Sequence, residues 1–147
     1  MGAARKTLYE IDGANRVLPL VRSIVRDVVE EFHALRASGR EQRALEAETE
    51  GDAASLRRIQ RLREHVNRCS ARIESYLREL DDLGLELRDL ETGLVDFPTI
   101  FYGEPAYLCW KPGEAEVAYW HAATEGFADR QPIPAETLAA LGTNPAG

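Results

Sequence analysis

Apolar residues recur at alternating spacings of four and three near the start of the chain, which predicts an amphipathic helix. The stripe consists of Ala14, Leu18, Val21, Val25, Val28, Phe32 and Leu35. Additional apolar residues widen it, so we expect this helix to contact more than one partner. Thr7 followed by Glu10 fits a capping box at the helix start. Pro19 predicts either a kink or the true first turn.

A second stripe keeps a strict heptad spacing over more than three heptads, which favours a long helix in a coiled-coil-like pair. It consists of Ile59, Leu62, Val66, Cys69, Ile73, Tyr76, Leu80 and Leu83. About 30 residues at 1.5 Å per residue give a helix of roughly 45 Å. An antiparallel hairpin with the first helix is the economical arrangement. The same seam could also join two copies of the chain.

The segment between the two stripes is polar. Ser38-Gly39 predicts a helix end and a turn. Residues 41–50 are helix-prone but nearly all polar, which fits either a short exposed helix or a mobile loop. Gly51-Asp52 should break the chain and cap the next helix.

After Gly84 the pattern changes to short alternating and aromatic-rich segments, which indicate strands. We expect strands at 85–90 and 94–97, with Pro98 ending the second. Segments 106–110 and 117–121 flank Lys111-Pro-Gly-Glu114, whose Pro-Gly suits a type II turn, and predict a hairpin.

The predicted fold is therefore α+β: a long antiparallel helical hairpin with a small antiparallel β-sheet subdomain in the C-terminal half. The hairpin covers 1–83, an acidic β subdomain packed on it covers 84–134, and a mobile tail covers 135–147. One helical turn is expected at 134–141.

The formal net charge of -7 makes the chain a poor candidate for general nucleic-acid binding. The last 64 residues carry 3 basic and 10 acidic side chains, so they hold the entire excess of negative charge. This part favours a cation or a basic partner, or serves solubility.

Two cysteines at positions 69 and 109 cannot form a disulfide framework or a CxxC zinc motif. The first residues lack the apolar stretch of a signal peptide, and the longest apolar run is too short to span a bilayer. These features predict a cytoplasmic protein without a membrane partner. The excess of arginine over lysine suggests a GC-rich bacterial genome.

Several blocks resemble an uncharacterised bacterial family known as domain of unknown function 2203. They are Gly84-Leu-Glu-Leu-Arg-Asp-Leu-Glu-Thr-Gly-Leu-Val-Asp-Phe-Pro98, Tyr107-Leu-Cys-Trp-Lys-Pro-Gly-Glu114, Val117-Ala-Tyr-Trp-His121 and Gly126-Phe-Ala-Asp-Arg-Gln-Pro-Ile133. The opening Thr7…Ala14-Asn15…Leu18-Pro-Leu-Val21 fits as well. The resemblance supports the element boundaries and implies no activity, substrate or cofactor.

Cys109 and His121 are a candidate nucleophile pair. If Pro112-Gly113 is the centre of the hairpin, Cys109 faces Glu116. His121 then lies five residues further on, roughly 16 Å away. This register predicts that Cys109 is only a small buried strand residue.

Asp96, His121 and Glu125 form a candidate carboxylate–histidine cluster that could bind a divalent metal or perform acid–base chemistry. Arg88 or Arg130 would hold an anionic substrate. The alternative is a histidine at a strand end that is hydrogen-bonded to a backbone carbonyl or to Asp96. The sequence leaves open whether Asp96 and His121 converge.

Eight of the eleven aromatic residues lie in 97–127, where they could line a pocket or pack the sheet on the helices. The same hairpin register places Trp110 and Trp120 on opposite faces, which makes them candidate contact residues.

A basic stripe follows one flank of the second helix and fits either an anionic partner or a solvated, salt-bridged face. It consists of Arg58, Arg61, His65, Arg68 and Arg72.

These patterns favour a non-enzymatic interaction or scaffold module that self-associates, as a homodimer, through the helical arm. The alternative is a small metal- or ligand-binding protein, or a hydrolase-like enzyme, with a carboxylate/histidine site in the β subdomain. The sequence identifies neither a small-molecule ligand nor a protein partner.

Overall fold

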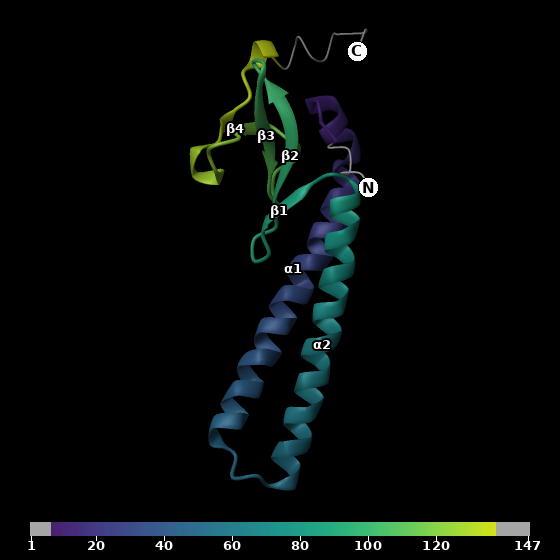
Figure 1. The fold of residues 1–147 in the computed structure, drawn as a ribbon, viewed down its shortest axis with the longest axis vertical. Coiled ribbons are helices and arrows are strands. Elements are labelled where there is room, and N and C mark those ends of the chain that lie inside the picture. The colour runs from purple at the N-terminus through teal and green to yellow at the C-terminus, as the bar shows by residue number, and fades with distance from the viewer. Residues whose placement is uncertain (1–6, 138–147) are drawn as a thin grey trace, which may run out of the picture.

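The computed structural model describes residues 7–137, and within them the chain forms two long helices and one five-stranded sheet. Helices α1 (Ile11–Glu48) and α2 (Ala53–Asp82) form an antiparallel hairpin (Figure 1). The strands are β1 (Glu86–Asp89), β2 (Leu94–Phe101), β3 (Glu104–Trp110), β4 (Tyr119–Ala122) and β5 (Gln131–Pro132), with a 3₁₀ turn η1 (Phe127–Asp129) before β5. The sheet order is β1-β2-β3-β4-β5 and every neighbouring pair is antiparallel. The predicted α+β fold is confirmed.

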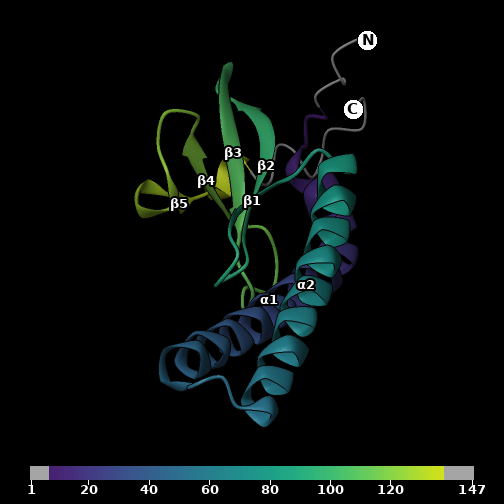
Figure 2. The same ribbon diagram turned by 60° about the horizontal axis from the view of Figure 1, so that its bottom comes forward.

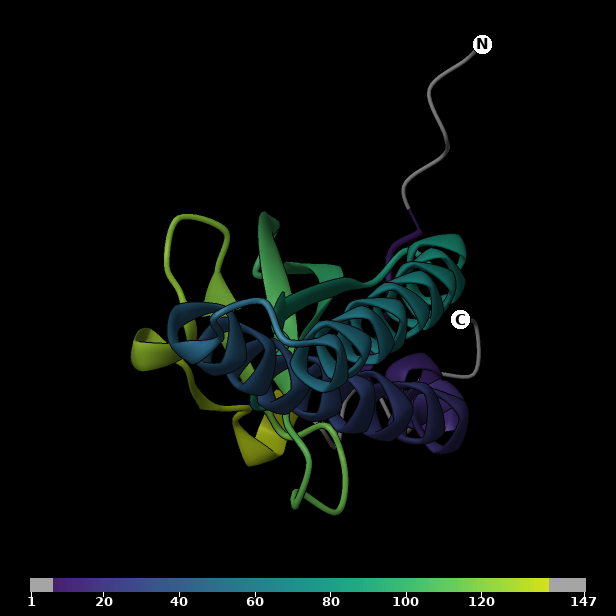
Figure 3. The same ribbon diagram turned by 90° about the horizontal axis from the view of Figure 1, so that it is seen from below.

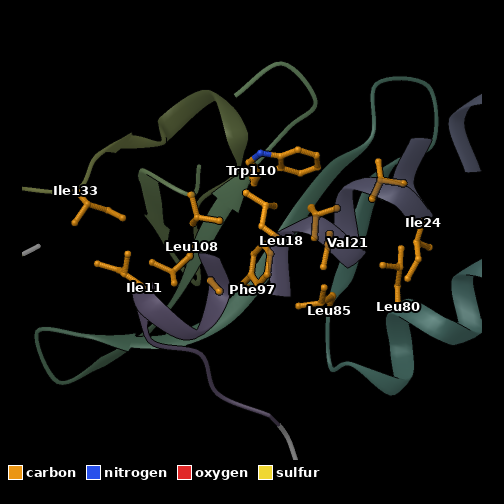
Figure 4. Packing of buried hydrophobic residues seen from close by; sticks show 14 of the residues in the cluster. Ile11, Leu18, Val21, Ile24, Leu80, Leu85, Phe97, Leu108, Trp110 and Ile133 are labelled. Atoms are coloured by element: carbon orange, nitrogen blue, oxygen red, sulfur yellow. The ribbon is translucent and has the colours of Figure 1, made fainter. Parts of the chain in front are cut away.

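The sheet packs beside the end of the hairpin where α1 begins and α2 ends. The part of the hairpin that follows Val28, the last buried residue of α1, extends past the sheet toward the α1–α2 connection and is called the arm (Figure 1). The view from below shows α1 and α2 side by side with the sheet next to them (Figure 3). One continuous core joins α1 and the end of α2 to the inner face of the sheet (Figure 4). Its most buried members include Val21, Val25, Val28, Phe97 and Trp110.

Helix α1 differs from its predicted boundaries at both ends. It begins at Ile11 after Glu10, without a side-chain cap, so the expected capping box of Thr7 and Glu10 is wrong. Pro19 lies inside the helix and does not mark its first turn.

The turn expected at Ser38-Gly39 is also wrong, because α1 continues to Glu48. Contacts with α2 outweigh the weak local propensity there. Glu41 and Glu46 form ion pairs with Arg58 and Arg63, and the Ser38 hydroxyl lies 2.7 Å from His65 Nδ1. Residues 41–48, which the sequence left open, are therefore helical.

Helix α2 confirms the predicted long helix, which packs against α1. Five of the eight seam positions are buried, and the other three are half-buried. Gly51 has a positive φ of 92°, and the Asp52 carboxylate accepts a hydrogen bond from the Ser55 N–H at 2.9 Å, as expected for a break and a new cap. Gly84, with φ of 79°, follows the end of the helix.

Strand β2 does not end at Pro98 as predicted but continues to Phe101. Strand β1 pairs with β2 only as far as Asp96. Among the described residues, no strand lies beside Pro98 on that edge of β2, so the N–H that proline lacks is not needed for a hydrogen bond between strands. The N-terminal segment covers this edge instead. The Tyr9 N–H donates to the Pro98 carbonyl at 2.7 Å, and the Thr99 hydroxyl donates to the Tyr9 carbonyl at 2.6 Å.

The hairpin of β3 and β4 has a different register from the predicted one. The turn at Lys111–Glu114 forms, with the Glu114 N–H donating to the Lys111 carbonyl, but β4 begins only at Tyr119. Cys109 therefore pairs with Tyr119 and not with Glu116.

This register also corrects the prediction for the tryptophans, because Trp120 pairs with Leu108 and shares the inner face with Trp110. Trp110 is fully buried and donates from Nε1 to the Glu114 carbonyl at 2.9 Å. Trp120 packs against the core and stacks on Phe101, with ring centroids 4.2 Å apart.

The helical turn expected at 134–141 is described only up to Thr137, and the rest of the predicted tail lies outside the described residues. Within residues 7–137, neither helix has a stretch both long and apolar enough to cross a membrane.

Gly93 and Gly103 have similar positive φ values but different surroundings. Substitutions at these two positions therefore distinguish the cost of backbone strain from the cost of overpacking. A Cβ at Gly93 would lie 2.6 Å from Val25 Cγ1, whereas a Cβ at Gly103 would meet no atom of residues 7–137 within 4 Å. We predict that Gly103→Ala lowers the free energy of unfolding by about 1–2 kcal/mol through strain alone. Gly93→Ala should lower it by about 1–3 kcal/mol more, because the added methyl group overpacks the contact with α1.

Urea denaturation of both variants measures this difference. Equal losses of stability would contradict the close packing of the β1–β2 turn on α1.

Candidate functional site

Three polar side chains are buried on the outer face of the sheet, away from the core. Asp96 on β2, Cys109 on β3 and His121 on β4 are exposed by 2%, 0% and 2%. The alternation along each strand directs them opposite to the core residues Phe97, Leu108 and Trp120. Such a face is normally solvated, and burying polar groups costs free energy unless they have hydrogen-bond partners, so the contacts of this cluster matter.

The Asp96 carboxylate is the centre of the cluster. His121 Nε2 lies 3.1 Å from each of its oxygens, and the Arg88 Nε donates to Oδ2 at 2.8 Å. Asp96 and His121 come from the two strands that flank β3, and Cys109 on β3 is the direct cross-strand partner of Asp96. A register irregularity between Leu87 and Asp89 directs Arg88 toward the same carboxylate.

The second ring nitrogen of His121 fixes the tautomer. Nδ1 lies 2.9 Å from the Ala122 carbonyl oxygen, which can only accept, so Nδ1 carries a proton and donates it. In a neutral ring, Nε2 then presents a lone pair to the two carboxylate oxygens. A proton or a metal cation between Nε2 and Asp96 removes this repulsion.

The segment between β4 and β5 covers the outer face. Figure 2 shows the sheet between the helices on one side and this yellow-green segment on the other. Arg130 holds it in place, because its guanidinium lies over the rings of Tyr119 and Phe127 at 4.0 and 4.4 Å. It also forms a double hydrogen bond with the Glu114 carboxylate, and both side chains are about seven-eighths buried.

Burial, together with the nearby Asp96 carboxylate, raises the pKa of the Cys109 thiol to about 12. Arg130 Nη1 lies 4.0 Å from the sulfur and opposes this shift without cancelling it. Cys109 is therefore a thiol at neutral pH, and a bound metal cation would convert it to a thiolate.

The donor set fits a small transition-metal ion. One ligand atom each from Asp96, Cys109 and His121 lies within 4.8 Å of the other two. Ligands of tetrahedral zinc at about 2.0–2.3 Å are separated from one another by roughly 3.3–3.8 Å. Nitrogen and oxygen are already close to that spacing, and a small side-chain movement would bring in the sulfur.

A pocket of about 320 Å³ adjoins the cluster at Asp96. Its wall consists of Arg88, Leu94, Asp96, Ala123, Glu125, Gly126 and Phe127. Glu125 Oε1 accepts a hydrogen bond from the Ala122 N–H at 3.1 Å, which holds this carboxylate at the pocket wall. The pocket therefore combines one member of the cluster with a cation, a second carboxylate and an apolar surface.

The structure brings some of the candidate residues together and separates others. Asp96, His121 and Arg88 converge. Glu125 lies at the pocket wall outside the ligand cluster. Arg130 is already paired with Glu114, and Trp110 and Trp120 face the core.

The sequence-based reasoning missed Cys109, because the predicted register placed it far from His121. Tyr107, not Cys109, is the direct partner of His121, so Cys109 and His121 are diagonal neighbours on one face. The alternation of side chains along the strands could have indicated this neighbourhood. In every register in which the numbers of two paired residues add up to an even number, residues 107, 109, 119 and 121 lie on the same face of the sheet.

The basic stripe of α2 forms ion pairs within the hairpin. Arg58 pairs with Glu41 at 2.7 Å, and Arg72 pairs with Glu31 at 3.3 Å. His65 contacts Ser38, as described above. These contacts agree with a salt-bridged helix flank.

The model of a family described as an uncharacterized conserved protein, DUF2203, matches residues 7–133. The chain belongs to this family. A search of curated proteins and a search of solved structures found no significant match. Membership in DUF2203 therefore covers both helices and the whole sheet, and the function must be argued from the site.

We predict that Cys109 resists alkylation in the native protein. With a pKa of about 12, about one thiol in ten thousand is ionised at pH 8, and the sulfur has no exposed surface. A Cys69→Ala variant leaves Cys109 as the single thiol. Its reaction with iodoacetamide, followed by mass spectrometry, should be far slower than that of the urea-unfolded protein.

Proposed function

We propose that this domain binds a divalent transition metal of the zinc class through Asp96, Cys109 and His121. The observation that carries the proposal is the convergence of three different ligand groups, within 4.8 Å of one another, on the face of the sheet opposite the core. A purely structural role would not require a carboxylate, a thiol and an imidazole at one point, because apolar side chains fill such a space at lower cost.

The identity of the donors favours zinc over magnesium or calcium. Hard alkaline-earth ions prefer a set of oxygen ligands, whereas thiolate and imidazole together suit Zn²⁺ and its neighbours. A reducing cytoplasmic location, predicted from the cysteine content, would keep Cys109 available as a ligand.

The neighbours of the ligands also support a metal site. Histidine ligands commonly donate their second N–H to a backbone carbonyl, and His121 does so to Ala122. Arg88 holds Asp96 at Oδ2, and the other carboxylate oxygen, Oδ1, lies 3.1 Å from Nε2 of His121, the second proposed ligand. Both contacts orient a ligand before the ion binds.

We predict that the purified protein binds one Co²⁺ per chain with a thiolate-to-cobalt charge-transfer band. Asp96→Asn, Cys109→Ala and His121→Gln should each weaken binding at least about 100-fold, since each removes a direct ligand. Titration by absorption spectroscopy measures the affinity.

Matched controls are Cys69→Ala and His33→Gln, which remove the same groups elsewhere. Circular dichroism shows whether each variant is folded. Folded Cys109→Ala protein with unchanged affinity would overturn the proposal.

A second candidate function is self-association of the arm, and a specific observation favours it. Near the sheet, Val21, Val25 and Val28 of α1 have no exposed surface, whereas Phe32 and Leu35 in the arm are only half-buried. A hollow of about 260 Å³ lies between the helices at Leu35, Gly39 and Val66, rimmed by Arg36, Arg40 and Arg43. Two helices alone therefore leave part of the arm's apolar seam uncovered.

A second copy of the chain suits this hollow because the arm is complementary to itself in charge. The acidic tip, with Glu46, Glu48, Glu50 and Asp52, would face the basic rim in an antiparallel arrangement.

We predict a dimer in equilibrium sedimentation, with twice the 16.4 kDa mass of one chain. Leu56→Glu should shift the protein toward monomer, because Leu56 is an apolar side chain that is 50% exposed on the arm. A strict monomer at all concentrations would exclude this second function and leave the metal proposal intact.

A further inference from the structure

We infer that the metal position opens into the pocket beside Asp96 and activates a water molecule for hydrolysis of a small carboxylic ester, with Glu125 as the base. This inference rests on the proposed metal site and adds to it an activity and a substrate class. Catalytic zinc sites have three protein ligands and one open position, whereas structural sites have four protein ligands.

The number and placement of ligands point to the open type. Asp96, Cys109 and His121 supply three donors, and Asp96 is also part of the pocket wall. Glu125 is the other carboxylate among the residues of that wall, but it lies outside the three-residue group. Its Oε1 is engaged by the Ala122 N–H, at a turn that follows β4.

This position suits a base better than a fourth ligand. A carboxylate at the wall of the pocket can accept a proton from a water molecule that occupies the space between it and the metal. The hydrogen bond from Ala122 orients Glu125 from the same strand end that carries His121.

The rest of the pocket suits a small ester. Its volume of about 320 Å³ is at the lower end of the range for small-molecule sites. Leu94, Ala123 and Phe127 provide an apolar wall for an acyl or alcohol group, and Phe127 is 39% exposed at this surface. The Arg88 guanidinium also lines the pocket, held there by Asp96 and Glu86, and its positive charge can stabilise negative charge that develops on the carbonyl oxygen.

The reaction balances without a further reactant. Water transfers a proton to Glu125, and its oxygen forms a bond to the carbonyl carbon of the ester. The bond from that carbon to the alcohol oxygen then breaks, and the leaving oxygen takes the proton from Glu125. The products are one carboxylic acid and one alcohol, and Glu125 returns to its starting state.

Two measurements on the full chain test this inference. In the first, azide is added to Co²⁺-loaded protein. An open position should bind azide and change the visible cobalt spectrum, whereas a spectrum that does not respond indicates a closed site and overturns the inference.

In the second measurement, Zn²⁺-loaded protein is assayed with p-nitrophenyl acetate. Glu125→Gln should lower kcat at least about 100-fold while Co²⁺ affinity stays within about twofold, because Glu125 is not a ligand. The control Glu104→Gln changes an exposed carboxylate at the β2–β3 turn and should leave kcat unchanged.

The outcomes separate the two proposals. Failure to bind Co²⁺ removes the metal site and the hydrolytic activity together. If Glu125→Gln strongly weakens metal binding, Glu125 is a fourth ligand. This outcome overturns only the proposed activity. Metal binding without any Glu125-dependent hydrolysis overturns the activity in the same way.

Discussion

Helix α1 has to pack against two partners at once, and the rest of the structure depends on this double contact. Its buried residues contact α2 on one side and the inner face of the sheet on the other, within a single core. Val21, Val25 and Val28 are completely buried for this reason. Beyond Val28, its last buried residue, α1 packs mainly on α2, and apolar residues such as Phe32 and Leu35 are only half-buried. The end of the hairpin beside the sheet is therefore tightly packed, whereas the apolar residues of the arm are only partly covered.

Polar side chains of α1 also affect the position of residues on the outer face of the sheet. Asn15 Oδ1 accepts from the Val117 N–H at 2.7 Å, and Arg22 donates to the Ala115 carbonyl at 3.1 Å. These two contacts hold the loop between β3 and β4 on the helix, two and four residues before β4 begins. The helix thereby helps to determine which residue of β4 faces Tyr107, and so where His121 lies.

Helical parts of the fold were predictable because their signal is periodic and long. The α2 heptad repeats often enough that a local irregularity does not obscure it, and the α+β class follows from the change of pattern after Gly84. The end of α1 was not predictable, because Ser38-Gly39 is a reasonable local stop. Long-range contacts override it, such as the Ser38–His65 hydrogen bond.

Prediction of the site failed at one step, the register of β3 and β4. Pro112-Gly113 forms a turn, but the strands do not pair symmetrically about it, because the loop is fixed by Trp110, Asn15 and Arg22 rather than by the turn alone. The paired positions sum to 228 in place of 225, for example Cys109 and Tyr119. Because the two sums differ by an odd number, the predicted register exchanges the two faces of β4 relative to β3. This single error separated Cys109 from His121 and placed Trp120 on the face opposite to Trp110. The candidate ligands were thus visible as residue types, whereas their convergence depends on contacts between segments about one hundred residues apart.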